Sequence, residues 1–379
     1  MRVLQFGRFH NEQQNGGVER HQQLLCKGLA ANGLDVVYLV ASANRLSHDE
    51  TIDGYRLIQS PSFGTLFSTA LSPAQVIKAL ELHRQQPFDI LHLHFPNPLA
   101  HLASVLFPPS VKRVITWHSD IVKQKRLLAI YRPFLQSVTR RADALIAATP
   151  AHYSSSSQIP KDISKDKLRV IPFGLDYSNL NLTPQSESVR NRLLSRANGQ
   201  AIVFALGRHV YYKGFDVLID AMQHVNAQLI IGGDGPLRPQ LQNQVEHLGL
   251  KNKIHFTGSI AEADLAAYFH ACDVFCLPSV EPSEAFGLVQ LEAMACGKPV
   301  ICTQLNNGVN VLNVHGETGF AVPVRDSFAL AERINQVLQD SQLRSMLGKQ
   351  AYARARQVYS LEANTQQHIR LYQELVNII

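Results

Sequence analysis

The sequence predicts an α/β protein made of two doubly wound domains that face a cleft. Its 379 residues exceed the length that one ordinary hydrophobic core organises, so two domains are expected. Short apolar runs alternate with helical patterns along the whole chain, which is typical of parallel sheets covered by helices. A long polar stretch interrupts the apolar runs once, near the middle, and divides the predicted strands into two series.

The first series of strands defines a domain that spans residues 1–180. We predict its strands at residues 3–6, 35–40, 55–59, 90–94, 113–117, 144–147 and 168–171. The second series defines a domain that spans residues 181–360, with strands at residues 201–206, 227–232, 254–257, 274–277, 300–302 and 319–322. The polar stretch between the series, from residue 172 to about residue 199, is predicted to be the interdomain linker.

Helical periodicity is clearest near the two ends of the chain. Residues 18–31 follow the first predicted strand, and the tail contains helical patterns at residues 328–338 and 361–379. In doubly wound sheets, ligands usually bind outside the carboxyl ends of the strands. The loops that follow the predicted strands are therefore the candidate sites.

The composition predicts a globular protein of the cytoplasm. Hydrophobic residues make up 45% of the chain and charged residues 17%. No apolar run approaches the roughly 18 residues that a bilayer-spanning helix needs, and residues 1–8 lack the apolar core of a signal peptide. The five cysteines lack paired zinc-ligand spacing, so buried or idle thiols are expected.

The net charge of +6 is unevenly distributed. Residues 1–180 contain 20 Lys and Arg against 13 Asp and Glu, whereas the remainder contains 16 against 17. No nucleic-acid-binding motif accompanies the basic excess. An anionic membrane surface is therefore the favoured partner of the first domain, and a merely solvated basic surface is the alternative.

Two carboxylates eight positions apart, Glu284 and Glu292, flank Gly287. If a helix begins near Gly287, Glu284 lies in the loop before it and Glu292 lies more than a turn inside it. The two acids then reach different parts of one elongated ligand, while the free amides of the first turn favour an anion. The segment predicts a site for a polyol that carries a phosphate; a capped helix with solvated acids is the alternative.

Two further loops of the second domain follow predicted strands. One contains Arg208 and Lys213 between glycines, and these two cations suit a diphosphate. The other contains Gly233 in a tight turn whose backbone can approach a nucleotide closely; a purely structural turn is the alternative. No Asp-x-Asp pair occurs to hold a divalent cation between phosphates, so we expect cations from Arg and Lys and no metal.

In the first domain, Gly16 and Gly17 lie between the first strand and a helix, where close approach to phosphate is favourable. Their spacing is not that of a dinucleotide-binding motif, and a plain flexible loop is the alternative. His118 and Asp120 follow another strand, where His118 could orient a hydroxyl and Asp120 could meet an acceptor. A metal cluster that includes the nearby His92, His94 and His101 is a further alternative.

Taken in order, these motifs resemble the retaining glycosyltransferases of family 4, which have the GT-B fold of two Rossmann-like domains. The resemblance runs over nearly the whole chain. The segments that carry it are Gly16-Gly17, Trp117-His118-Ser119-Asp120, Ile171–Asp176, Gly207-Arg208 with Lys213-Gly214, Gly233-Asp234-Gly235-Pro236, Leu277-Pro278-Ser279, the Glu284/Glu292 pair and Gly316–Phe320.

The resemblance implies a role for each position that matches a family motif. It implies that Glu292 binds the nucleotide ribose, that Glu284 faces the donor sugar, and that Arg208 and Lys213 clamp the diphosphate. It further implies that His118 lies near the donor sugar. It also implies that the amides of Gly16, Gly17, Leu288 and Val289 assist in binding the diphosphate. Finally, it implies that a C-terminal helix, residues 361–379, packs back on the first domain.

Two segments, residues 117–125 and residues 283–287, are similar to bacterial O-antigen mannosyl- and rhamnosyltransferases that use GDP-sugars. The first of them contains Lys123, which joins Asp120 as an acceptor-side candidate. The similarity implies transfer of a hexose, with GDP-mannose as the best donor candidate, to a lipid-linked or oligosaccharide acceptor at the inner face of the plasma membrane. A UDP-sugar donor is the first alternative. An epimerase, a phosphorylase or a non-catalytic sugar-nucleotide-binding protein is less favoured.

Overall fold

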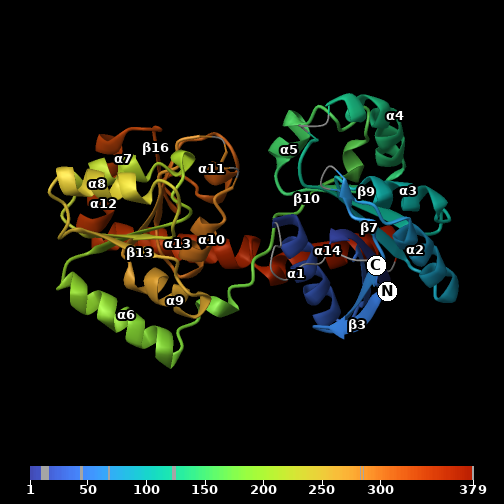
Figure 1. Ribbon diagram of the computed structural model, residues 1–379, viewed down its shortest axis with the longest axis horizontal. Helices are drawn as coiled ribbons and strands as arrows, with labels where there is room; N and C mark the ends of the chain where they lie inside the picture. The colour runs from blue at the N-terminus through green and yellow to red at the C-terminus, as the bar shows by residue number, and fades with distance from the viewer. Residues whose placement is uncertain are drawn as a thin grey trace. The chain divides into compact units, whose positions relative to one another are not determined.

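The computed structural model describes residues 1–9, 17–42, 46–66, 69–121, 125–281, 283–284 and 286–377. The chain forms two compact units, of which unit 1 comprises Met1–Leu175 with Ser360–Ile379 and unit 2 comprises Asp176–Tyr359 (Figure 1). Each unit has a largely parallel sheet with helices on both faces, so the predicted doubly wound α/β architecture is confirmed. The first crossing between the units lies at residues 175 and 176, slightly before the predicted boundary at residue 180.

Unit 1 contains an eight-stranded sheet in the order β10-β9-β8-β7-β1-β2-β4-β3. Its strands are β1 Arg2–Phe9, β2 Asp35–Ala41, β3 His48–Ile52, β4 Tyr55–Ser60, β7 Ile90–Phe95, β8 Lys112–Trp117, β9 Ala144–Ala147 and β10 Leu168–Val170, and a separate hairpin pairs β5 Thr65–Leu66 with β6 Thr69–Ala70. Only β3 runs antiparallel to its neighbour within this sheet. The sequence analysis missed β3 because this edge strand is polar and largely exposed, and therefore has no apolar run.

Two helix layers cover this sheet. Alternate strand residues such as Leu4 and Phe6 face α2 Pro73–Gln85, α3 Pro98–Leu106 and α4 Lys125–Arg141, and α5 Pro150–Ser155 follows β9. The opposite face, which includes Val3 and Tyr38, packs against α1 Gly17–Ala31 and the C-terminal helix α14 Leu361–Leu375. The C-terminal helix thus completes the core of unit 1.

Unit 2 contains a six-stranded parallel sheet in the order β13-β12-β11-β14-β15-β16. Its strands are β11 Ile202–Leu206, β12 Gln228–Gly232, β13 Ile254–Gly258, β14 Val274–Leu277, β15 Val300–Thr303 and β16 Gly319–Val322. Its α-helices are α6 Pro184–Ala197, α7 Phe215–Ala221, α8 Arg238–His247, α9 Glu262–Ala271, α10 Val289–Ala295, α11 Gly308–Leu312, α12 Ser327–Gln339 and α13 Ser341–Val358. Single 3₁₀ turns lie at Lys165–Lys167 in unit 1 and at Ser178–Leu180, Tyr211–Lys213 and Met222–His224 in unit 2.

The prediction of a linker over residues 172–199 was wrong, because helix α6 occupies Pro184–Ala197 within unit 2. Thr183 and Ser186 form a reciprocal capping box at its start, and Asn198 adopts φ 48° at its end. Only Ser186 and Ala197 of the helix are buried, so its sequence lacks the apolar stripe that marks a core-facing helix. None of the helices in the described part of the chain is both long and apolar enough to cross a membrane.

Candidate active site

The loops that follow β11 and β12 pack backbone against backbone at the carboxyl ends of two central strands. The amide of Gly207 donates to the carbonyl of Gly232 at 3.1 Å, and that of His209 donates to the carbonyl of Asp234 at 2.9 Å. Gly233 has φ +101°, and a Cβ there would lie 2.1 Å from the carbonyl oxygen of Gly207. Glycine is therefore required at residue 233 both by the backbone conformation and by the close approach.

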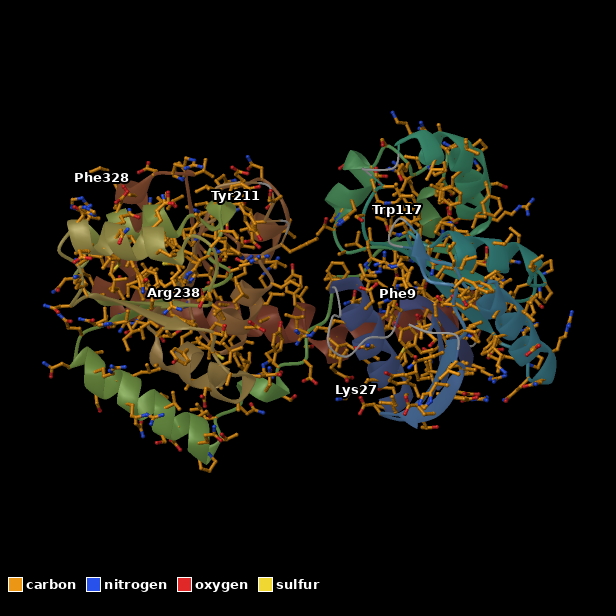
Figure 2. All side chains as sticks on the ribbon, viewed as in Figure 1. Phe9, Lys27, Trp117, Tyr211, Arg238 and Phe328 are labelled. Carbon is orange, nitrogen blue, oxygen red and sulfur yellow. The ribbon has the colours of Figure 1, made fainter. Side chains whose placement is uncertain are left out.

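Asp234 stabilises this turn through its carboxylate. It accepts from the amide of Gly235 at 2.7 Å and pairs with Arg238 of α8, also at 2.7 Å (Arg238 is labelled in Figure 2). These two contacts, the amide of Gly235 first, lower the pKa of Asp234. The turn after β12 thus holds its own shape through Asp234.

Lys213 and Glu284 form an ion pair between two loops that lie far apart in the sequence. The Nζ of Lys213 lies 2.5 Å from the Oε2 of Glu284, and each residue is only 9% exposed. The hydroxyl of Ser279 donates to the same Oε2 at 2.9 Å. Among the described residues, the Oε1 of Glu284 has no hydrogen-bond partner, so this oxygen is left available to accept from a ligand.

The fold explains why these two loops meet. Lys213 ends the 3₁₀ turn after β11, and Ser279 lies just beyond β14, the strand that pairs with β11. The amide of Val280 donates to the carbonyl of Tyr212 at 2.8 Å. Gly214 has φ +65°, and a Cβ there would lie 2.1 Å from the carbonyl oxygen of Pro278. Because β11 and β14 are neighbouring strands, the Lys213 ammonium and the Glu284 carboxylate come into contact.

Two residues to which the sequence analysis gave no role in the site hold Glu284 in place. The hydroxyl of Ser279 donates to the Glu284 carboxylate, and the side-chain amide of Asn307 donates to the backbone carbonyl of Glu284 at 2.7 Å. The position of Ser279 directly after a strand was a usable signal, whereas Asn307 lies after another strand, β15, and could be placed only with the strand order known.

Gly287 precedes helix α10 with φ +58°, and the helix begins at Val289, so the expected helix start near Gly287 is confirmed and Glu284 lies in the loop before it. Leu288 occupies the N-cap position, so the amides of Leu288 and Val289 lie where a helix has no internal acceptors for them. Glu292 lies in the first turn and is half-buried. Burial, with a smaller contribution from the Glu292 carboxylate, raises the pKa of Tyr177.

Arg208 differs from Lys213 in its surroundings. Its side chain is exposed, and within the described ranges no carboxylate lies in ion-pair distance of its guanidinium. The structure thus brings Lys213 and Glu284 into contact, whereas the side chain of Arg208, which lies in the same loop as Lys213, is exposed to solvent.

In unit 1, His118 follows β8 and is buried beside other aromatic rings. Its Nε2 lies 3.0 Å from the Nδ1 of His94, and its ring stacks on that of Phe173 at 5.8 Å between centroids. Burial lowers the pKa of His118 to about 3, with smaller effects of the positive charges of Arg8 and His152. His118 is therefore a neutral imidazole at physiological pH.

Asp120 is engaged in contacts within unit 1. Its carboxylate accepts from the indole N–H of Trp117 at 3.0 Å, from the Ser156 hydroxyl at 2.6 Å and from the Ser157 amide at 2.9 Å (Trp117 is labelled in Figure 2). Asp120 therefore links the loop after β8 to the loop after α5. Gly16 and Lys123 lie outside the described residues, and Gly17 is the first residue of α1.

The histidines considered for a metal cluster are engaged with protein partners. His92 and His94 take part in hydrogen bonds on one face of the sheet of unit 1, whereas His101, on α3, bonds to Tyr131 of α4 on the other face. Within the described ranges, no group of three His, Cys, Asp or Glu side chains is arranged to hold a metal ion. The five cysteines are free thiols, four of them buried.

The chain matches two family models, Glycosyltransferase Family 4 over residues 15–179 and Glycosyl transferases group 1 over residues 190–354. O-antigen chain mannosyltransferase C from Escherichia coli is 29% identical over 99% of both chains. D-rhamnosyltransferase WbpZ from Pseudomonas aeruginosa is 31% identical over 95% of this chain and 92% of its own.

Two solved structures share the fold of the whole chain. A glycosyltransferase from Rickettsia africae superposes with a TM-score of 0.76 at 21% identity, covering 99% of this chain and 98% of its own. Anabaena Alr3699/HepE, solved in complex with UDP, superposes with a TM-score of 0.70 at 23% identity, covering 99% and 100%. The resemblance that the order of the motifs predicted is confirmed: the chain belongs to glycosyltransferase family 4, and it is a glycosyltransferase with the GT-B fold.

Proposed function

We propose that this enzyme transfers a mannosyl group, with retention of configuration, from GDP-mannose to a lipid-linked or oligosaccharide acceptor in the synthesis of bacterial O-antigen. The proposal rests on the end-to-end similarity to a relative named as an O-antigen mannosyltransferase. It also rests on the one observation that ties the site together, the convergence of Lys213 and Ser279 on a single oxygen of Glu284.

In this proposal, unit 2 binds the donor without a metal. Arg208 and Lys213 neutralise the diphosphate, and Glu292 accepts from the ribose hydroxyls. Because Oε2 of Glu284 is occupied by protein donors, Oε1 is the oxygen that accepts from a sugar hydroxyl. As the leaving phosphate takes up the proton of the acceptor hydroxyl, no protein nucleophile is required.

The nucleotide preference can be tested by thermal unfolding in EDTA with GDP-mannose and UDP-glucose as ligands. GDP-mannose at 100 times its dissociation constant is expected to stabilise the protein by about 2.7 kcal/mol. Arg208→Ala should abolish most of this stabilisation, whereas Arg196→Ala, which removes an exposed arginine of α6, should leave it unchanged. Greater stabilisation by UDP-glucose would overturn the GDP assignment.

We further propose that the α2–α3–α4 layer of unit 1 contacts an anionic membrane. The exposed side of α4 carries Ile130, which is 82% exposed, together with Arg140 and Arg141. Ile77 of α2 and Leu106 of α3 are also more than half exposed on the same layer. Exposed apolar and basic side chains on one helix layer match the chemistry of an anionic bilayer surface.

Vesicles that contain anionic phospholipid are expected to bind the protein at low salt and to release it at high salt, since the Debye length shrinks to about 3 Å at 1 M. Ile130→Glu should weaken the binding, whereas Phe328→Glu should not, because Phe328 is a comparably exposed residue of unit 2 (Figure 2). Equal binding to neutral vesicles, or equal effects of the two substitutions, would contradict the proposed surface.

A further inference from the structure

Helix α11 is a short helix that side chains from other elements of unit 2 contact at both ends. It comprises Gly308–Leu312, between β15 and β16, and belongs to the same unit as α10 and α13 (Figure 1). Five residues are too few for a helix that is stable alone, since isolated helices shorter than about 12 residues are marginal in water. The position of α11 therefore depends on the contacts that neighbouring elements make with it.

At its amino end, α11 is linked to the loop that contains Glu284. Asn307 is the N-cap residue of α11, and its side-chain oxygen accepts from the amide of Val309 at 3.0 Å. The side-chain nitrogen of Asn307 donates to the backbone carbonyl of Glu284 at 2.7 Å. One side chain thus joins the first turn of α11 to the backbone of the loop before α10.

Gln290 makes a second link between the same two segments. It lies on α10 and is fully buried. Its side-chain nitrogen donates to the carbonyl of Phe286 at 2.9 Å and to the carbonyl of Val309 at 3.1 Å, so both amide hydrogens are used. Because a carbonyl that loses its donor inside the protein is costly, the loop and α11 both depend on this side chain.

At its carboxyl end, α11 is linked to α13. The Nε of Arg354 donates to the carbonyl of Leu312 at 3.0 Å, and its Nη2 donates to the carbonyl of Val311 at 2.8 Å. The last carbonyls of a helix have no acceptor role within the helix, so Arg354 satisfies two groups that would otherwise need another partner. A continuous series of contacts therefore leads from Arg354 through α11 to Glu284.

The loop of Glu284 is held in two independent ways. Lys213 and Ser279 contact the carboxylate of Glu284. Asn307 and Gln290 instead contact the backbone carbonyls of the loop. Because the second pair is coupled to α11, a shift of this helix changes the direction of the Glu284 Oε1 even when the ion pair with Lys213 persists.

We propose that Gln290, Asn307 and Arg354 are positioning residues, which act through α11 to hold Glu284 in the orientation that accepts from the donor sugar. The identity of this ligand rests on the proposed function. Within the described ranges, the hydrogen bonds of the three residues reach the loop of Glu284 or α11, but neither Arg208 nor Glu292. They are therefore expected to affect binding of the sugar more than binding of the nucleotide.

The difference between sugar and nucleotide binding gives the first test. Titration calorimetry of the full-length protein with GDP and with GDP-mannose measures how the mannosyl group changes the affinity. Arg354→Met and Gln290→Met should each weaken the binding of GDP-mannose about tenfold, as expected for one lost hydrogen bond, and leave the binding of GDP unchanged. An equal loss for both ligands, or no loss for either, would overturn the proposal.

Asn307→Ser tests the amino end of α11 separately. Serine still caps the helix, but its shorter side chain cannot also reach the carbonyl of Glu284, so the same selective loss is expected. If Arg354 acts through α11, the Arg354→Met/Asn307→Ser double variant should lose less GDP-mannose affinity than the two single losses combined. Fully additive losses would show that α11 does not transmit the effect of Arg354.

Arg344→Met is the matched control. Arg344 also lies on α13 and donates to the end of a helix, but its acceptor is the carbonyl of Leu338 in α12, at 2.9 Å. Its substitution should lower the stability of the protein and leave both affinities as in the wild type. A selective loss of GDP-mannose binding in this variant would mean that any damage to α13 disturbs the site, which contradicts a specific role of Arg354.

Hydrogen exchange of the ligand-free protein separates this inference from the proposed function. Arg354→Met should accelerate exchange of the backbone amides at residues 286–288, whereas Arg344→Met should leave it unchanged. This measurement needs no donor, so a wild type that fails to bind GDP-mannose would refute the proposed donor without deciding the role of α11. Unchanged exchange at residues 286–288 in the Arg354→Met variant would overturn that role.

Discussion

Replacing either Lys213 by Met or Glu284 by Gln is expected to destabilise the folded protein and to abolish transfer, whereas the double variant should regain stability and stay inactive. Each single change leaves one group of a nearly buried ion pair without its partner, which costs about 3 kcal/mol. Removal of both groups eliminates the unpaired charge. Transfer should fall at least about 100-fold in all three variants, because the diphosphate loses a cation or the sugar loses an acceptor.

The exposed ion pair between Lys251 and Glu246 of the same unit is the matched control, since both side chains are about 60% exposed. Lys251→Met should change the free energy of unfolding by less than about 1 kcal/mol and leave transfer intact. Denaturant unfolding and initial-rate measurements separate the two effects. Full activity in the Lys213 and Glu284 variants would refute the site assignment, and a double variant no more stable than the single ones would refute the coupling of the pair.

The loops of the donor site were predictable because their signal is local. In a parallel α/β protein, glycines and cations directly after an apolar run lie at the carboxyl edge of a sheet, whatever the order of the strands. This reasoning selected Arg208, Lys213 and Gly233 correctly as residues of loops that follow β11 and β12. The assignment of the chain to its family followed from the same loops taken in order.

The contacts between these loops were not predictable, because they depend on which strands are neighbours. Lys213 meets Glu284 only because β14 lies beside β11, and Gln5 meets His92 only because β1 pairs with β7 in that register. A single sequence contains no signal for strand order. The same argument applies to α6, which is stabilised by its caps and a few contacts rather than by an apolar stripe.

The histidines of unit 1 make a second large effect predictable, a loss of stability on mild acidification. His21, His92, His94, His118 and His368 are all buried, and burial is the largest cause that lowers the pKa of each. For His118 the pKa falls to about 3 and for His368 to about 4.

The sign of the effect follows from linkage. In the unfolded chain these histidines take up protons below a pKa of about 6.5, whereas in the folded unit they stay neutral. Unfolding therefore takes up protons between pH 6.5 and about pH 4, and the stabilisation present above pH 6.5 is lost as the pH falls. At pH 5, each histidine that stays neutral in the folded state lowers the free energy of unfolding by about 2 kcal/mol relative to its value above pH 6.5.

Trp117 is a suitable reporter, because it is the single tryptophan of the chain and is buried in unit 1. Urea unfolding followed by its fluorescence at pH 7.5, 6.0 and 5.0 should give a steep decline in the stability of this unit. His368→Met removes one of these buried histidines, so the slope below pH 6 should decrease by about 1.4 kcal/mol per pH unit. His247→Gln, at an exposed position of α8, should leave the slope unchanged.

A pH-independent stability between pH 7.5 and 5 would mean that the folded unit accepts protons at these histidines as readily as the unfolded chain does. That result would also remove the physical basis for a permanently neutral His118, because the same burial keeps the whole cluster uncharged. A decline that His368→Met does not reduce would instead place the acid sensitivity elsewhere in the unit. The buried, uncharged histidine cluster thus makes the stability of the first unit depend on pH over the range in which His118 stays neutral.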